Sequence, residues 1–261
     1  MLSVVMVTYN RAHLLERSLE VYSNQPFKDF ELIIIDDDST DNTQELLKSY
    51  SKKLNIVSII VRKNGEWRDC ACNINLGLRA AKGDFIVATH PEVIPGWMSL
   101  TAMNEMKGHE KYITSKIYFL SIDEQNKLDT VDWKNNPLDV RNLEGFYESG
   151  SINELDYYSH AEMDKNTYWE SWVFGGMSRK TWRRIGGFTE FTTWGSVDID
   201  FAARRYLLNI PTITLLQDET FCIHQNHDDP EKNIVTPRDI DICRNALQHY
   251  NHPYEAIKNN L

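Results

Sequence analysis

Long hydrophobic runs and cysteine clusters are both missing from this chain of 261 residues. No apolar run reaches the roughly eighteen residues that a membrane-spanning helix needs, so the sequence predicts no transmembrane segment. The four cysteines lack the CxxC spacing of a zinc site, and we expect free thiols in a reducing compartment. The opening MLSVVMVTYN has neither the basic start nor the cleavage site of a secretory signal. We therefore expect a cytoplasmic protein, with peripheral attachment to a membrane left open.

Basic residues are also few compared with acidic ones. The chain has 28 Lys and Arg residues and 38 Asp and Glu residues, which gives a net charge of -10. An acidic surface repels a phosphate backbone, so nucleic acid is not expected as a partner. Hydrophobic residues make up 41% of the chain, which is enough for a sizeable core and argues against disorder. Nothing in the composition fixes the oligomeric state.

Apolar strand-like runs alternate with segments of helical periodicity over the first 95 residues. Such alternation predicts βαβ units and a mostly parallel sheet. The expected strands cover residues 2–7, 30–35, 55–61 and 84–89. We expect a single domain over residues 1–227, with a nucleotide-binding half at 1–95, an acceptor half at 96–227, a polar, aromatic-rich insertion at 121–170 and a polar, partly helical tail at 228–261.

Polar side chains follow the first two predicted strands. The first strand runs into Thr8-Tyr9-Asn10-Arg11 and the second into Asp36-Asp37-Asp38. The carboxyl ends of parallel strands form the edge where such sheets bind ligands, and the N–H groups of a helix start suit an anionic or polar ligand. Adjacent carboxylates need a donor nearby, which the imino N–H of uracil or thymine can supply to Asp36. An ordinary βα loop and a helix N-cap cluster are the alternatives.

The order of several short motifs resembles glycosyltransferase family 2, the inverting enzymes with the GT-A fold. SVVMVTYNR and IIIDDDSTDNT resemble its nucleotide-sugar-binding start, and FGGMS, IGGFTE and WGSVDIDFAARR resemble later motifs in the same order. The resemblance covers most of residues 3–227 and excludes the insertion and the tail. It implies an α/β fold, a three-layer αβα GT-A-type domain, and sugar transfer from a nucleoside diphosphate sugar to an acceptor hydroxyl with inversion.

The resemblance also implies how the donor is bound. The residues matching Thr8, Tyr9, Arg11 and Asp36 hold the nucleoside, which favours a UDP- or dTDP-sugar. Arg68 is expected to balance the charge of the diphosphate, because guanidinium groups pair well with phosphate oxygens. A solvated surface arginine is the alternative for Arg68.

The family carries a metal-binding Asp-x-Asp motif after the fourth strand, where this chain has His90-Pro91-Glu92. A carboxylate is a hard oxygen ligand, and an imidazole suits Mn²⁺ better than Mg²⁺. A late histidine often completes the site in GT-A enzymes, and His224 fits that place, with His227 as the alternate. The predicted ligands are therefore Glu92, His90 and His224, with Mn²⁺ favoured over Mg²⁺. A plain strand-end loop and weak metal dependence are the alternatives.

An inverting transfer needs a base that takes the proton of the attacking hydroxyl. Asp198 matches the catalytic aspartate of the family motif, although Val197 replaces the glutamate that precedes it. The resemblance places Gly175 and Gly176 at the floor of the donor-sugar pocket and Trp194 beside the base. An N-cap role is the alternative for Asp198.

Aromatic residues are numerous in and near the insertion, and aromatic faces stack on sugar rings, so we expect a glycan acceptor. They are Trp133, Tyr147, Tyr157, Tyr158, Tyr168, Trp169 and Trp172. Two other functions stay open. One is a pseudoenzyme that binds a nucleotide or glycan without transfer. The other is a nucleotidyltransferase, although TYNRAHLLE lacks the glycine-rich loop that would hold a triphosphate.

Overall fold

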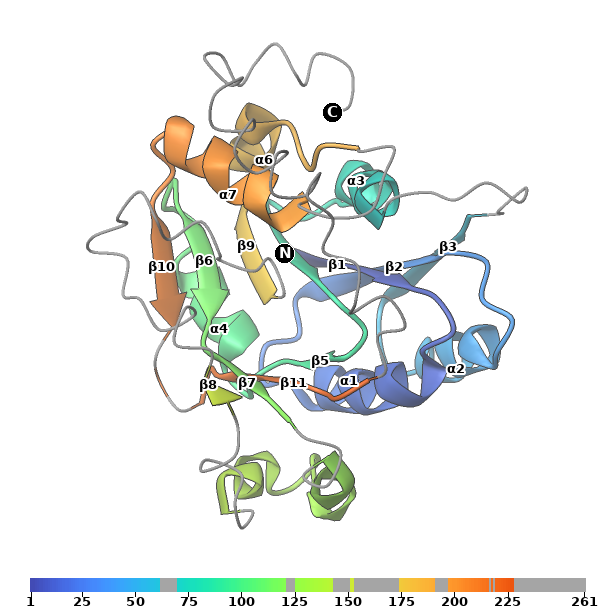
Figure 1. Cartoon of the computed structure of the whole chain (residues 1–261). Helices are drawn as coiled ribbons and strands as arrows, with labels where there is room; N and C mark the ends of the chain where they lie inside the picture. Colours follow the sequence, from blue (N-terminus) through green and yellow to red (C-terminus); the bar gives the residue numbers. More distant parts are fainter. Residues whose placement is uncertain are drawn as a thin grey trace.

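A central sheet of seven strands, in the order β10-β6-β9-β4-β1-β2-β3, organises the part of the chain described by the computed structural model (Figure 1). The described residues are 1–61, 70–120, 125–142, 151–152, 174–190, 197–215, 217 and 219–227. The strands of this sheet are β1 (Leu2–Thr8), β2 (Phe30–Asp36), β3 (Ile56–Ile60), β4 (Phe85–Thr89), β6 (Tyr112–Ser115), β9 (Phe174–Ser178) and β10 (Thr212–Leu215).

Most neighbouring strands of this sheet are parallel. β1 pairs in parallel with both β2 and β4, β2 with β3, and β6 with β10. β9 is the exception, since it runs antiparallel to β4 and β6. The predicted mostly parallel sheet and the four predicted strands of its first half are confirmed.

Helices cover both faces of the sheet because the side chains of each strand alternate between two apolar clusters. Val4 and Met6 of β1 point into one cluster, and Val5 points into the other. The first cluster is covered by α1 (Ala12–Asn24), α2 (Thr43–Tyr50) and α4 (Ser99–Glu105). The second is covered by α3 (Cys70–Ala80), α6 (Arg179–Ile185) and α7 (Val197–Leu207). Figure 1 shows α3, α6 and α7 on one side and α1 and α2 on the other, which confirms the three-layer αβα architecture.

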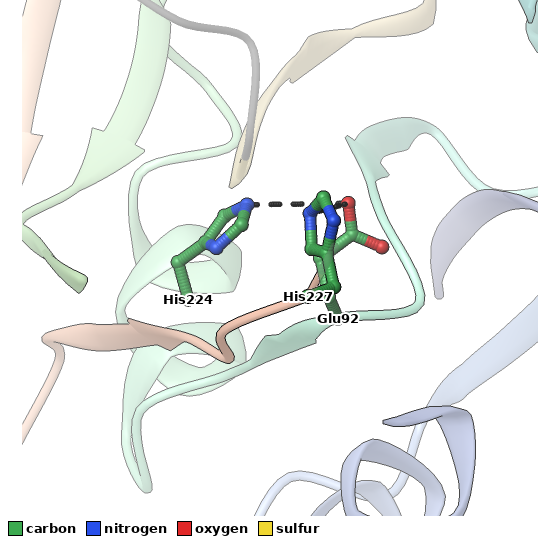
Figure 2. Close-up of side chains that lie close together, drawn as sticks. All are labelled: Glu92, His224 and His227. Carbon is green, nitrogen blue, oxygen red and sulfur yellow. Dashed lines mark ion pairs between the residues drawn. The ribbon is translucent and has the colours of Figure 1, made fainter. Parts of the chain in front are cut away.

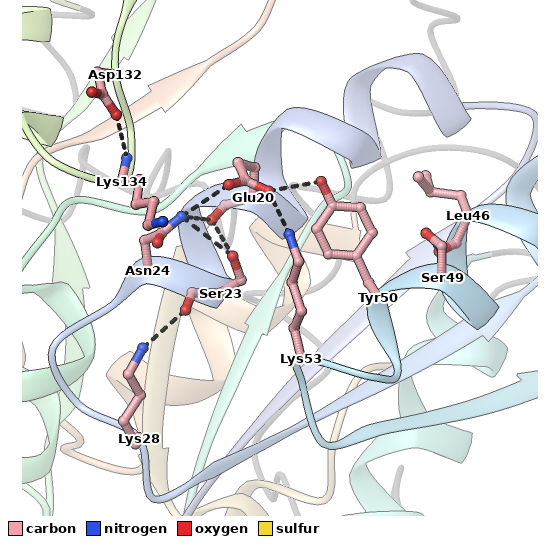
Figure 3. A network of polar contacts seen from close by, with 10 residues as sticks. All are labelled: Glu20, Ser23, Asn24, Lys28, Leu46, Ser49, Tyr50, Lys53, Asp132 and Lys134. Carbon is pink, nitrogen blue, oxygen red and sulfur yellow. Dashed lines mark hydrogen bonds and ion pairs between the residues drawn. The ribbon is translucent and has the colours of Figure 1, made fainter.

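Polar contacts tie α2 to α1 on the outer surface of their layer (Figure 3). The Tyr50 hydroxyl donates to Glu20 Oε2 at 3.0 Å, and Lys53 Nζ lies 3.6 Å from the same oxygen. Asn24 Nδ2 donates to the other carboxylate oxygen of Glu20 at 3.1 Å. Partial burial and the neighbouring carboxylate raise the pKa of Tyr50, so its hydroxyl keeps the proton that forms this bond. One acid of α1 thus anchors the end of α2.

A second, smaller sheet has the strand order β5-β11-β7-β8. Its strands are β5 (Val93–Ile94), β7 (Ile117–Phe119), β8 (Ser151–Ile152) and β11 (Cys222–His224). β11 runs antiparallel to β5, and the register places His224 opposite Val93. This pairing brings a late segment of the chain beside the segment that follows β4.

Part of the predicted insertion, residues 125–142, forms two 3-10 helices, η1 (Asn126–Thr130) and η2 (Pro137–Asn142). The insertion was expected to be polar, but Leu128, Val131 and Val140 are buried in a third apolar cluster with residues of the small sheet. Trp133 packs partly buried against this cluster, while the six other aromatic residues named above lie outside the described residues. Within the described ranges, no helix has both the length and the apolar character to span a bilayer.

Candidate functional site

The two polar strand ends expected to bind a nucleoside meet at one edge of the sheet. Thr8 ends β1, Asp36 ends β2, and the strand register pairs these two residues. The N–H of Asp37 donates to the carbonyl of Thr8 at 2.9 Å, which extends the pairing by one residue. Both Thr8 and Asp36 are buried, whereas Tyr9 is 48% exposed and offers a ring at this edge. The arrangement matches the predicted one, and nucleoside binding stays a prediction.

The chain itself supplies donors to the Asp36 carboxylate. Asp36 Oδ1 accepts a hydrogen bond from the N–H of Ser39 at 2.9 Å, and Oδ2 accepts from the side-chain amide of Gln44. We had expected a nucleobase to provide such a donor. Each carboxylate oxygen can accept a second bond, so the internal donors fix the orientation of Asp36 and leave it able to bind a further N–H.

The amino terminus of α1 is occupied by a carboxylate of the neighbouring loop. Asp41 Oδ2 accepts from the N–H of Ala12 at 3.0 Å, and Asn10 Oδ1 accepts from the N–H of Thr40 at 2.7 Å. Burial opposes ionisation of Asp41, but hydrogen bonds from Thr43 and Ala12 outweigh it and lower its pKa. The N–H group that we expected to favour an external anion is therefore already used at Ala12.

Three potential metal ligands converge just beyond β4 and β11 (Figure 2). Glu92, His224 and His227 each offer a ligand atom, and these atoms all lie within 4.8 Å of one another. Glu92 Oε1 lies 3.9 Å from His224 Nε2 and 3.6 Å from His227 Nε2. The N–H of Gln225 donates to the carbonyl of Glu92 at 3.0 Å, which holds the two segments together. Glu92 and His224 are together as predicted, and His227, the alternate, joins them.

His90 and Arg11 also lie beside the Glu92 carboxylate. His90 Nδ1 lies 3.7 Å from Glu92 Oε1, so His90 contacts the cluster without belonging to its three converging ligands. Arg11 Nη1 lies 3.7 Å from Glu92 Oε2. Arg11 therefore links the cluster to the turn that follows β1. Sequence reasoning placed Arg11 with the nucleoside and missed this link, because only the fold brings the two segments together.

The electrostatics of the cluster give it one anionic oxygen and a neutral imidazole. Burial opposes ionisation of Glu92, but attraction to His90 and Arg11, and to His224 when its imidazole is protonated, outweighs burial and lowers the pKa of Glu92. Burial lowers the pKa of His224 to about 4, although Glu92 acts in the opposite direction. At neutral pH His224 is therefore uncharged, and the permanent charge of Arg11 stabilises the carboxylate. A neutral imidazole has the lone pair that a metal ion needs.

The cluster fits a divalent cation on a second ground. Glu92 Oε2 is buried and forms no hydrogen bond with any residue that the structure describes. A buried carboxylate oxygen that accepts no hydrogen bond is costly even with Arg11 at 3.7 Å, and coordination to a cation lowers that cost. Two imidazole nitrogens and one carboxylate form a donor set typical of transition metals. Glu92, His224 and His227 could therefore hold such an ion and leave positions for other ligands.

Close packing accounts for the two glycines that we expected at the floor of the donor pocket. A Cβ atom at Gly175 would lie 2.0 Å from the Tyr112 hydroxyl, and one at Gly176 would lie 2.6 Å from the Phe85 ring. Both glycines lie in β9, between β4 and β6. Their role toward the donor sugar stays a prediction.

Three further predicted site residues are Arg68, Trp194 and Asp198. Arg68 and Trp194 lie outside the described residues. Asp198 is the second residue of α7, and the description of the structure stops at its backbone. Its proposed role as base therefore rests on the motif and on this place at the start of a helix.

A fully buried ion pair fixes α7 against α6. Arg204 Nε donates to Asp200 Oδ2 at 2.8 Å, between residues four positions apart in α7. Arg204 Nη1 also donates to the carbonyls of Ile185 and Gly187, at 2.7 and 2.8 Å. Gly186 and Gly187 have φ values of 81° and 75°, which favour glycine, and Arg204 binds the backbone of this turn. The pair thus sets the position of the helix that begins beside Asp198.

We expect Arg204→Ala to lower the free energy of unfolding by about 3–5 kcal/mol, because it leaves Asp200 buried without its cation. Urea denaturation followed by circular dichroism measures this loss. Lys48→Ala, at an exposed position of α2, is the control and should change stability by about 0.5 kcal/mol or less. A loss for Arg204→Ala as small as that of the control would contradict the structural role of the pair.

Known proteins match both the sequence and the fold. A family model described as Glycosyl transferase family 2 matches residues 3–90. The chondroitin synthase of Escherichia coli is 30% identical over 243 residues, which cover 78% of this chain and 32% of that protein. The chain thus spans about a third of the length of this curated relative.

Two solved structures share the fold at low sequence identity. TarS of S. aureus, in complex with UDP-GlcNAc, aligns with a TM-score of 0.69 and 18% identity over 94% of this chain and 65% of that one. The mannosyltransferase PcManGT of Pyrobaculum calidifontis, in complex with GDP-Man and Mn²⁺, aligns with a TM-score of 0.57 and 17% identity over 98% and 72%. These matches and the sheet topology show that the chain has the GT-A fold, and the family model shows that its residues 3–90 belong to glycosyl transferase family 2.

Proposed function

We propose that this chain transfers a sugar from a nucleoside diphosphate sugar to an acceptor hydroxyl, with inversion at the anomeric carbon. The observation that carries the proposal is the cluster of Glu92, His224 and His227 at the nucleoside edge of the sheet. Arg11 joins the two sites, since it belongs to the turn after β1 and pairs with Glu92. The TarS and PcManGT complexes support the proposal, because each contains a nucleoside diphosphate sugar.

The divalent cation is held by Glu92, His224 and His227, and His90 supports the carboxylate from the side. This assignment replaces the sequence-based set of Glu92, His90 and His224 by one that the geometry favours. A bound cation stabilises the negative charge that develops on the diphosphate leaving group. Imidazole nitrogens favour Mn²⁺ over Mg²⁺, and the Mn²⁺ in the PcManGT complex supports that choice.

The nucleoside lies at the ends of β1 and β2. Tyr9 offers an exposed ring for stacking on the base, and Asp36 accepts an imino N–H from it. Only uracil and thymine carry that donor at the required position among the pyrimidines, so a UDP- or dTDP-sugar is favoured. UDP-GlcNAc in the TarS complex agrees with a uridine donor.

The acceptor is a hydroxyl group of a glycan, and Asp198 takes its proton. Asp198 lies in the first turn of α7, whose position the Asp200–Arg204 pair fixes. Gly175, Gly176 and Trp194 are assigned to the donor-sugar pocket by the family motif. The name of the E. coli relative, chondroitin synthase, supports a glycan acceptor.

A thermal-shift panel tests the donor site. UDP, dTDP, GDP and CMP are each added with Mn²⁺, Mg²⁺ or EDTA. Binding to the native state raises Tm, so we expect a rise of about 5–10 °C with UDP or dTDP and Mn²⁺ at a hundred times Kd. We expect a much smaller rise with Mg²⁺ and none in EDTA.

Each other result of the panel contradicts part of the proposal. A rise that is equal in EDTA would remove the cation from nucleotide binding. A larger rise with GDP than with UDP would overturn the assignment of a pyrimidine. No rise with any nucleotide would contradict the donor site as a whole.

A further inference from the structure

A pocket with a basic rim lies between α3 and α6, away from the site described above. Its empty volume is about 430 Å³ and it opens to solvent. The apolar residues at its base are buried, and three arginines complete its lining without any acidic residue. The lining residues are Leu78, Arg79, Ile86, Arg179, Trp182 and Arg183.

The pocket lies near the amino end of β4, whereas the cation cluster lies beyond the carboxyl end of that strand. Ile86 is near the amino end of β4, and Arg179 directly follows Ser178, the residue paired with Phe85. The cation cluster follows the carboxyl end of the same strand, after Thr89. A strand of this length separates the two edges by roughly 13 Å. A ligand in the pocket would therefore be independent of the donor site.

Arg179 is held rigidly at the rim. Its Nε and Nη2 donate to the carbonyl of Gly83 at 3.1 and 2.6 Å, and its Nη1 donates to the carbonyl of Ala81 at 2.7 Å. These partners are neutral carbonyls at the end of α3, so the bonds orient the guanidinium without cancelling its charge. Its remaining N–H groups are available to a ligand.

Arg183 lies one turn further along α6 on the same side of the helix. It is exposed and forms no hydrogen bond or ion pair with any part of the chain that the structure describes. The two other basic residues of α6, Lys180 and Arg184, are both paired with Glu110. Glu110 therefore neutralises the two basic residues of α6 that do not line the pocket.

We propose that this pocket binds a phosphate group. Guanidinium groups present paired donors that match phosphate oxygens, and here three of them surround one opening. The apolar base of the pocket lowers the local dielectric and strengthens these contacts. The charge is concentrated here although the chain as a whole carries -10. The phosphate comes either from a small soluble phosphate compound or from a phospholipid headgroup.

Titration calorimetry with inorganic pyrophosphate in EDTA tests the pocket itself. EDTA removes divalent cations, so binding at the cation cluster does not contribute. We expect the double variant Arg79→Ala/Arg183→Ala to bind pyrophosphate at least about tenfold more weakly than the unmodified chain. Lys180→Ala, which removes a charge from α6 outside the pocket, is the matched control and should bind as the unmodified chain does. Thermal melting of each variant confirms that the fold is kept.

Vesicle sedimentation distinguishes the two sources of phosphate. Vesicles of phosphatidylcholine are compared with vesicles that also contain phosphatidylglycerol. Sedimentation with the second kind only, lost in the double variant, supports a headgroup. Pyrophosphate binding without sedimentation supports a soluble phosphate compound. If the unmodified chain binds neither probe, or if the double variant binds as the unmodified chain does, the proposal is overturned.

Discussion

Glu92→Gln is expected to abolish the Mn²⁺-dependent rise in Tm with UDP and to lower kcat/KM for transfer by about 10²–10³. Glu92 provides the anionic oxygen that lies 3.6 Å from His227 Nε2 and 3.9 Å from His224 Nε2. Glutamine has the same size as glutamate but carries no negative charge. The cation then loses its strongest ligand, and the diphosphate leaving group loses the charge that stabilises it.

The fold should tolerate this substitution. The charge opposite Glu92 belongs to Arg11, whose side chain is 28% exposed, and the amide oxygen of glutamine can still accept a hydrogen bond from its guanidinium. The matched control is Glu16→Gln, at an exposed position of α1, which should leave kcat/KM unchanged. Calorimetric titration with Mn²⁺ gives a readout that does not depend on turnover. Mn²⁺ affinity within twofold of the unmodified chain would show that Glu92 is not a ligand.

Asp198→Asn is expected to lower kcat by about 10²–10⁴ while donor binding is kept. The reaction needs a base at the acceptor hydroxyl, and asparagine cannot take a proton. Asparagine also keeps the size of the side chain and serves as well as aspartate at a helix start, so the substitution preserves α7. Transfer rates at saturating donor measure kcat, and the thermal shift with UDP and Mn²⁺ measures donor binding.

Asp139→Asn, at an exposed position of η2, is the control for a lost carboxylate and should retain full activity. Turnover of Asp198→Asn within a few-fold of the unmodified chain, with the fold intact, would contradict the assignment of the base. A loss of the UDP shift together with activity would instead place Asp198 in donor binding.

The first half of the fold could be predicted from sequence largely because three of its strands are buried on both faces. β1, β2 and β4 are almost wholly buried. Their sequences are therefore continuous apolar runs, which predict buried strands directly. β5 and β7 are two and three residues long, which is too short for any periodicity to show. α4 and β6 likewise carried no signal that we recognised. The short strands β5 and β7 of the second sheet were missed for this reason.

The candidate site was predictable in its residue types and less so in its geometry. Glu92 and His224 were found from the places of the motifs, but the choice between His90 and His227 depends on the turn after β11. Asn75 shows the opposite case, in which a buried polar residue serves the fold. Its amide donates to the carbonyl of Phe188 at 2.7 Å and accepts from the N–H of Phe188 at 2.9 Å. Residue type alone cannot separate these roles, because both use the same polar atoms.

The pairing of β11 with β5 has a consequence for how the protein forms during synthesis. The strands β1 to β4, which carry the proposed nucleoside site, leave the ribosome long before His224 and His227. The proposed cation ligands are thus separated by a long stretch of chain, and such distant contacts form late in folding. A nascent chain that ends before β11 carries Glu92 without its two histidines. Cation binding would therefore mark the completion of folding rather than assist its first steps.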